Sequence, residues 1–179
     1  MVSNDVSKMD IQGSWFSACH DSFWFGGGKA TAEMVIRDGY IRKTYAWDRN
    51  TQGNCSTVGI EFSVESTYQL GEKVTAPENA NALDSFVQKI IIIPRTDAWA
   101  NGLRNAGVCG LTTQWARGVP VDVTRLSCNF AHLPLIRNHY GIVKRDIGQL
   151  FFGGSMGNAD GTSPERRSVI LDLNEVYAF

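Results

Sequence analysis

The sequence predicts a mainly β protein, built either as an antiparallel barrel or as a β-sandwich. Aromatic residues make up 11% of the chain, and 18 glycines stand against only 5 prolines. This balance favours sheet and tight turns over a helical bundle. Several short segments alternate apolar and polar residues, with turn residues about every 8–12 positions, as in antiparallel barrels and sandwiches. Only one segment has the pattern of a helix.

The composition is that of a soluble globular domain without a nucleic-acid partner. Hydrophobic residues make up 43% and charged residues 20%, and the formal net charge is −1, so no basic field attracts nucleic acid. The longest apolar run, 90–93, is far shorter than the roughly 20 residues of a membrane-spanning helix, and we predict no transmembrane segment. We expect one domain over 11–179 after a flexible segment 1–10, which lacks the apolar stretch of a signal peptide.

The first half of the chain is expected to form strands over 11–20, 30–37, 40–47 and 60–68. The pair Asp38-Gly39 separates the second strand from the third, and an aspartate–glycine pair between β-rich runs is a strong hairpin signal. In the fourth strand Ile60, Phe62 and Val64 alternate with polar residues. This alternation predicts one buried and one solvated face.

The second half contains the predicted helix. A strand is expected over 86–93, followed by a helix over 97–106 that begins at a capping Asp97 and closes at Gly107. A further strand is possible over 112–115. Strands over 140–145 and 149–152 should flank a tight turn at 146–148. The last strand is expected over 168–177.

Four cysteines, Cys19, Cys55, Cys109 and Cys128, allow three pairings. The organisation of the chain suggests local disulfides, Cys19 with Cys55 and Cys109 with Cys128. None of the four forms a C-x-x-C motif, which argues against a zinc knuckle. Disulfides favour the periplasm or the outside of a cell, the export signal or lipoprotein leader being absent from this sequence. The alternative is a cytoplasmic protein with four reduced thiols.

The segment Gly13-Ser14-Trp15 resembles the G-x-W signature of lipocalins and related calycin β-barrels. The wider frame adds the segments Tyr45–Asp48, Tyr68–Gly71, Gln149–Gly153 and Arg167–Tyr177. Together they look like bacterial lipocalin-like envelope proteins of unassigned function. They are also similar, more faintly, to the extracellular barrel domains of adenomatosis-polyposis-coli down-regulated 1-type proteins. The resemblance implies an up-and-down barrel with one short helix, in which Trp15 plugs the closed end and Gly13 has a structural role.

Two lipocalin features are missing from this sequence. The T-D-Y motif is absent, and the arginine that packs on the tryptophan in lipocalins lies near the end of the final strand. Here Arg166 and Arg167 precede the expected last strand, so neither is assigned that role.

Catalytic motifs are weak in this chain. Gly153–Gly157 matches the G-x-S-x-G pattern around Ser155, but that motif needs a following helix and a downstream histidine. No histidine follows His139. We therefore expect no enzyme activity.

Metal binding is also not expected. His20, His132 and His139 lack the spacing of helical metal ligands, and Glu61 and Glu65 should lie on the solvated face. Glu33 and Asp172, the other carboxylates on expected strands, complete no catalytic pair on the sequence alone. We predict neither a metal nor a cofactor.

The expected function is non-enzymatic binding of an apolar or amphipathic, lipid-like small molecule in the barrel. Trp24 and Phe25 precede three glycines and would form either an apolar rim at the barrel mouth or core beneath their loop. The inward positions expected to line the interior are Met34, Ile36, Tyr45, Ile60, Phe62, Val64 and Phe151. The alternative is a cell-envelope interaction or structural module with a filled barrel and no ligand.

Overall fold

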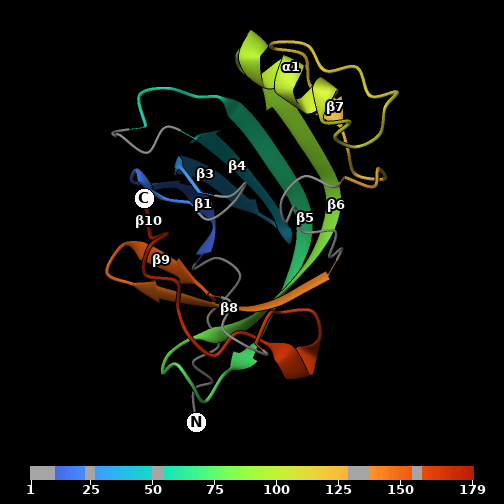
Figure 1. Ribbon diagram of the computed structural model, residues 1–179. Helices are drawn as coiled ribbons and strands as arrows, with labels where there is room; N and C mark the ends of the chain where they lie inside the picture. Colours follow the sequence, from blue (N-terminus) through green and yellow to red (C-terminus); the bar gives the residue numbers. More distant parts are fainter. Residues whose placement is uncertain (1–10, 23–26, 50–54, 129–137, 155–158) are drawn as a thin grey trace.

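The computed structural model describes residues 11–22, 27–49, 55–128, 138–154 and 159–179, and its strands form one antiparallel sheet (Figure 1). Its strands are β1 (Gly13–Ser17), β2 (His20–Asp21), β3 (Lys29–Arg37), β4 (Tyr40–Asp48), β5 (Ile60–Lys73), β6 (Asn81–Pro94), β7 (Val121–Asp122), β8 (Asn138–Asp146), β9 (Gln149–Phe152) and β10 (Tyr177–Ala178). The helix α1 spans Asp97–Asn105, and a short 3-10 helix spans Pro164–Arg166. The predicted flexible segment 1–10 lies outside the described residues.

The sheet closes on itself to form a barrel. The strands follow the order β1-β10-β9-β8-β6-β5-β4-β3, and β1 pairs with β3 to complete a ring of eight. β2 pairs with β3 and β7 with β6, so both lie outside this ring. Every pairing is antiparallel between strands that follow one another around the barrel. The predicted barrel is confirmed, and the sandwich alternative is not.

Local turn chemistry explains the β3–β4 hairpin. Asp38 and Gly39 have φ values of 35° and 80°, the pattern of a two-residue turn whose twist matches that of the flanking strands. The pairing then runs without a break from Arg37 opposite Tyr40 to Lys29 opposite Asp48. The sequence-based prediction of a hairpin at Asp38-Gly39 is therefore correct.

The hydrophobic core fills the inner face of the barrel. Tyr45 on β4 lies opposite Ala32 on β3 and Phe62 on β5, and Phe62 lies opposite Ile92 on β6. All four are buried, and the rings of Tyr45 and Phe62 stack with centroids 4.5 Å apart. Alternation along each strand thus places one apolar row inside the ring.

The helix α1 packs beside the ends of β4 and β5 (Figure 1). The ring of Trp99 meets that of Trp47 edge-on, with centroids 5.1 Å apart. A Cβ atom at Gly59 would lie 2.3 Å from the Trp99 indole nitrogen, so only glycine allows this approach. The helix begins at Asp97 as predicted and ends one residue before the predicted end, but its N-cap is Thr96 and not Asp97: the Thr96 hydroxyl accepts from the Trp99 amide.

The segment after α1 extends the hydrophobic core of the barrel. Trp115 is buried and donates its indole N–H to the Val108 carbonyl at 3.1 Å. A disulfide between Cys109 and Cys128 closes the segment. The strand considered over 112–115 does not form, because Trp115 anchors a loop under α1 instead of pairing in the sheet.

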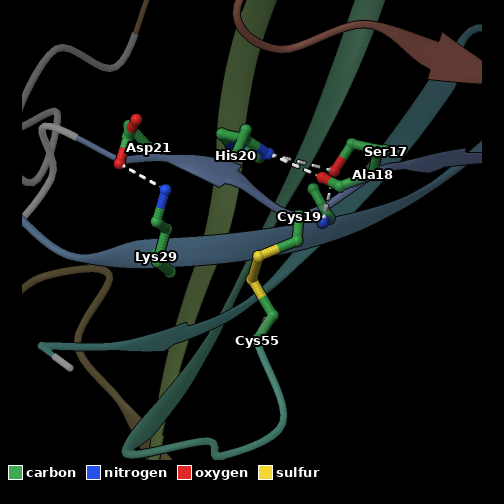
Figure 2. The surroundings of a disulfide bond; sticks show 8 residues. Ser17, Ala18, Cys19, His20, Asp21, Lys29 and Cys55 are labelled. Atoms are coloured by element: carbon green, nitrogen blue, oxygen red, sulfur yellow. Dashed lines mark hydrogen bonds and ion pairs between the residues drawn. A yellow bond between two sulfur atoms is a disulfide. The ribbon is translucent and has the colours of Figure 1, made fainter. Parts of the chain in front are cut away.

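Both predicted disulfides are confirmed. Cys19, between β1 and β2, bonds to Cys55 in the segment before β5 (Figure 2). Beside this bond, Lys29 forms an ion pair of 2.8 Å with Asp21. Two disulfides are typical of an oxidising compartment. Among the described residues no helix is long and apolar enough to cross a membrane.

Trp15 closes the end of the barrel where the β3–β4 hairpin lies. It is 1% exposed and donates its indole N–H to the Ile11 carbonyl at 2.9 Å. The Phe179 ring meets it edge-on at 5.3 Å, and the Arg145 guanidinium lies 5.8 Å from its ring centroid. Gly13 is required here, because its φ is 138° and an added Cβ would lie 2.5 Å from Phe179. The guanidinium that lies near Trp15 thus belongs to Arg145 on β8.

The predicted last strand, 168–177, is wrong for most of its length. Only Tyr177–Ala178 forms a strand, β10, and Leu171 makes an isolated bridge with Gly153. Tyr177 pairs with Leu150, and Leu171 pairs with Gly153. The chain from Leu171 to Tyr177 is longer than the opposing stretch from Leu150 to Gly153. The extra residues bulge out of the pairing.

The β8–β9 hairpin gives a first testable prediction. Ile147 and Gly148 have φ values of 36° and 74°, the same turn as Asp38-Gly39. A β-branched residue is strained in this conformation, and Ile147 is 97% exposed. Ile147→Asn should therefore raise the free energy of unfolding by about 1 kcal/mol in urea denaturation. The reverse change, Asp38→Ile, should lower the free energy of unfolding by a similar amount. If Ile147→Asn does not raise the free energy of unfolding, the Ile147 side chain itself contributes to stability.

Candidate functional site

Most of the predicted lining residues lie on the inner face of the barrel. Five of them are buried there: Met34, Ile36, Tyr45, Ile60 and Phe62. Val64 faces inward but is only half-buried. Phe151 was placed on the wrong face: it lies opposite Lys144, whereas Phe152 lies opposite the buried Val143 and packs against the core. Trp24 and Phe25 lie outside the described residues.

Among the described residues, the candidates for catalysis or metal binding form no metal-binding cluster. Glu61 lies on the outer face and forms an ion pair with Arg95, and Glu65 follows on the same face of β5. Ser155 and His132 lie outside the described residues. Within the described part of the chain, no group of three His, Cys, Asp or Glu side chains is placed to hold a metal ion.

A lysine that the sequence reading did not single out lies inside the barrel. Lys43 stands on β4 between Ile41 and Tyr45, two buried residues of the inner face. Its ammonium is 4.6 Å from the Tyr45 ring centroid, 5.1 Å from that of Tyr177 and 5.8 Å from that of Phe152. Aromatic faces attract a cation at such distances. Its side chain remains 22% exposed.

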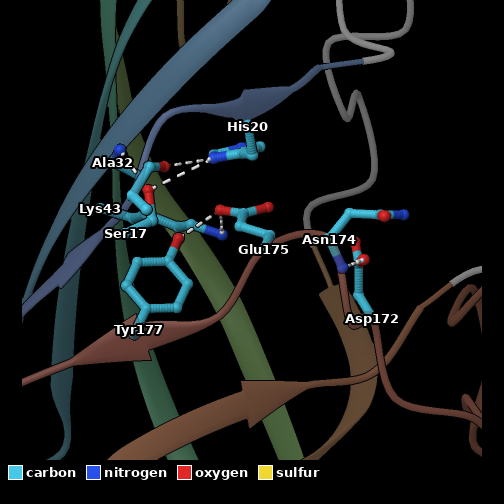
Figure 3. Close-up of polar contacts among 9 residues, drawn as sticks. Ser17, His20, Ala32, Lys43, Asp172, Asn174, Glu175 and Tyr177 are labelled. Atoms are coloured by element: carbon cyan, nitrogen blue, oxygen red, sulfur yellow. Dashed lines mark hydrogen bonds and ion pairs between the residues drawn. The ribbon is translucent and has the colours of Figure 1, made fainter. Parts of the chain in front are cut away.

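Glu175 reaches this lysine from the bulge before β10 (Figure 3). Its Oε1 lies 2.7 Å from Lys43 Nζ, and the Tyr177 hydroxyl donates a hydrogen bond to the same oxygen. The charge of Glu175 also acts on Tyr45, whose pKa it helps to raise. We call Lys43, Tyr45, Glu175 and Tyr177 the interior cluster.

Small side chains make room for the interior cluster. Tyr45 on β4 lies opposite Ala32 on β3, and Tyr177 on β10 lies opposite Ser17 on β1. Ala32 and Ser17 adjoin, since the Ala32 amide donates to the Ser17 hydroxyl at 2.7 Å. Two short side chains therefore separate the two tyrosines around the barrel wall. Figure 3 shows Lys43, Glu175 and Tyr177 converging beside Ser17.

The electrostatics keep Glu175 charged and both tyrosines neutral. Burial alone would raise the pKa of Glu175, but the charge of Lys43 and hydrogen bonds from Lys43 and Tyr177 lower it below the ordinary value. Burial, reinforced by Glu175, raises the pKa of Tyr45 well above its usual range. The pKa of Tyr177 is likewise raised by burial, then by Tyr45 and Glu175. The cluster thus holds one ammonium, one carboxylate and two phenol hydroxyls at neutral pH.

Two histidines lie near the interior cluster. His20 has its Nδ1 3.0 Å from the Ala18 carbonyl and 3.4 Å from the Ser17 hydroxyl (Figure 3). Burial, followed by the charges of Lys43 and Arg167, lowers the pKa of His139. His139 is therefore neutral at physiological pH.

The sequence contained one signal for this cluster. In an alternating strand, Lys43 occupies a position of the apolar face, between Ile41 and Tyr45. Glu175 carried no such signal, because its position depends on the bulge. No model of a known protein family matches the chain, and no curated protein matches it either.

Proposed function

We propose that the protein binds an apolar or amphipathic small molecule inside its barrel without catalysing a reaction. The observation that carries this proposal is an apolar barrel interior containing one ion pair whose side chains are not fully buried. Small-molecule sites commonly combine apolar walls with a few polar groups that fix orientation. Barrels of about eight strands have room for one small ligand.

Partly accessible residues on the inner face support the proposal. Val64 lies opposite Lys43, and Val87 lies opposite the buried Ser66. Both valines face inward yet are only half-buried, like Phe152 near the interior cluster. In a solidly filled barrel these central positions would be covered. A lipid-like molecule would gain roughly 25 cal/mol for each Å² of apolar surface that it buries there.

The two disulfides favour a site of action in the periplasm or outside the cell. In such a compartment the two disulfides would stay oxidised. The protein would also meet lipid-like molecules there. We therefore propose a periplasmic or secreted binding protein of the lipocalin-like type.

The second candidate is an interaction or structural module with a filled barrel. It is favoured by the complete burial of Met34, Ile36 and Phe62 and by the exposed apolar side chains of Phe16 and Phe179. In that case the core would serve stability alone, and the outer surface or the loops would carry the function.

Titration with the neutral fluorescent probe N-phenylnaphthylamine tests the proposed function. Saturable binding is expected, and Val64→Phe should weaken it about tenfold by filling part of the interior. Thr67→Phe, on the outer face of the same strand, is the matched control and should leave binding unchanged. Native mass spectrometry of the gently purified protein should reveal a bound lipid. Absence of saturable binding would favour the filled barrel.

A further inference from the structure

The interior cluster is arranged as a receptor for a carboxylate. The Lys43 ammonium and the Tyr177 hydroxyl contact the carboxylate of Glu175, and the Tyr45 ring, which carries a further hydroxyl donor, has its centroid 4.6 Å from that ammonium. All three donor residues stand on strands of the barrel wall, β4 and β10. Charge-assisted hydrogen bonds of this kind are the strong ones, and converging donors give them direction.

The carboxylate comes from a different kind of structure. Glu175 stands in the irregular stretch between Leu171 and Tyr177, outside any strand. A hydrogen bond of 2.9 Å from the Asn174 amide to the Asp172 carboxylate shapes this bulge. The donors are thus fixed by the sheet, whereas the group that they hold is on a segment with few ladder hydrogen bonds. Such segments open at low cost compared with paired strands.

A charge pair inside an apolar barrel also calls for a reason other than stability. Replacing a buried ion pair by apolar residues is often neutral or stabilising. Here the side chains are 22% exposed for Lys43 and 13% exposed for Glu175, so the pair is partly accessible. The half-buried Val64 lies directly opposite Lys43, so an apolar side chain adjoins the ion pair.

We infer that Lys43, Tyr45 and Tyr177 form a carboxylate-binding site inside the barrel, that Glu175 occupies it in the ligand-free protein, and that an amphipathic carboxylate competes with Glu175 for it. This inference rests on the proposed function and specifies its ligand class. The apolar tail lies along the inner face beside Val64 and Phe62. Glu175 then acts as a built-in competitor that sets the affinity.

The test compares three probes that share one alkyl tail: decanoate, decanol and decyltrimethylammonium. Isothermal titration calorimetry below their micelle concentrations measures each affinity for the wild-type protein, Glu175→Gln, Lys43→Met and the double variant. Glu65→Gln and Lys144→Met, both on the outer face, are controls with the same changes of charge.

The inference requires decanoate to bind the wild-type protein more tightly than decyltrimethylammonium. Glu175→Gln should raise the affinity for decanoate about tenfold or more, because it removes the competing charge. Lys43→Met should lower the decanoate affinity by a similar factor. The double variant, which retains no charge in the site and is expected to fold, should bind decanoate and decanol alike. The outer-face controls should match the wild type.

Other results separate the inference from the proposed function. Equal affinities for the three probes in every variant would overturn the carboxylate site while leaving binding in the barrel intact. A preference for decyltrimethylammonium that is lost in Glu175→Gln would also overturn it, in favour of a cation site around Glu175. If decanol and N-phenylnaphthylamine both fail to bind any variant, the proposed function fails and the inference fails with it.

Discussion

Trp15→Ala should lower the free energy of unfolding by about 3–5 kcal/mol, the usual cost of deleting a buried large aromatic side chain. Trp15 is 1% exposed and lies between Phe179 and Arg145. Its removal leaves a cavity. It also leaves the Ile11 carbonyl without the indole N–H that donates a hydrogen bond to it. Because this residue closes one end of the barrel, the loss should appear as a large shift of the urea midpoint, followed by far-UV circular dichroism.

Phe16→Ala provides the control for that experiment. Phe16 is the next residue on β1 and is 53% exposed, so its removal should cost less than about 1 kcal/mol. A similar loss in both variants would mean that the strand as a whole, and not the Trp15 side chain, is responsible. An unchanged midpoint for Trp15→Ala would contradict the described packing.

Local signals made much of the barrel predictable. The strands around Asp38-Gly39 could be placed because alternation and turn chemistry both act within a few residues. The fourth predicted strand, 60–68, begins where β5 begins, but β5 continues to Lys73. The disulfide partners also followed from chain order, since the first cysteine bonds to the second and the third to the fourth.

The parts that could not be predicted depend on contacts between distant segments. The bulge before β10 arises from the mismatch with β9, and it alone brings Glu175 to Lys43. The position of Arg145 near Trp15 depends on the closed ring, in which β9 and β10 lie between β8 and β1. Phe151 and Phe152 are both large and apolar, so composition could not decide which of them faces inward. The pairing with Lys144 and Val143 decides it.

Lys43→Met should destabilise the protein by about 3–5 kcal/mol, because it leaves the carboxylate of Glu175 inside the barrel without its ion-pair partner. The double change with Glu175→Gln should recover most of this loss, since an apolar replacement of a buried pair is often neutral or better. Double-mutant cycles in urea denaturation measure the coupling. Asp21→Asn, at an ion pair whose carboxylate is 73% exposed, is the surface control and should cost at most about 1 kcal/mol.

The pH dependence distinguishes this coupling from a general packing defect. In the wild-type protein the pKa of Glu175 is lowered, so its contribution is fully present above the unfolded value of about 4.3 and is lost as the pH falls through the folded pKa.

In Lys43→Met the lowering influence of the ammonium is gone, and burial raises the pKa of Glu175 above the unfolded value. The penalty in this variant is therefore present at neutral pH and is relieved as the carboxyl becomes protonated. The difference in stability between wild type and Lys43→Met should narrow as the pH falls from neutral towards the unfolded pKa. In the double variant this narrowing should disappear, because no carboxylate remains to be protonated. A constant difference across this range would mean that Lys43 stabilises the barrel through the packing of its aliphatic stem against Tyr45 and Tyr177, and not through its charge.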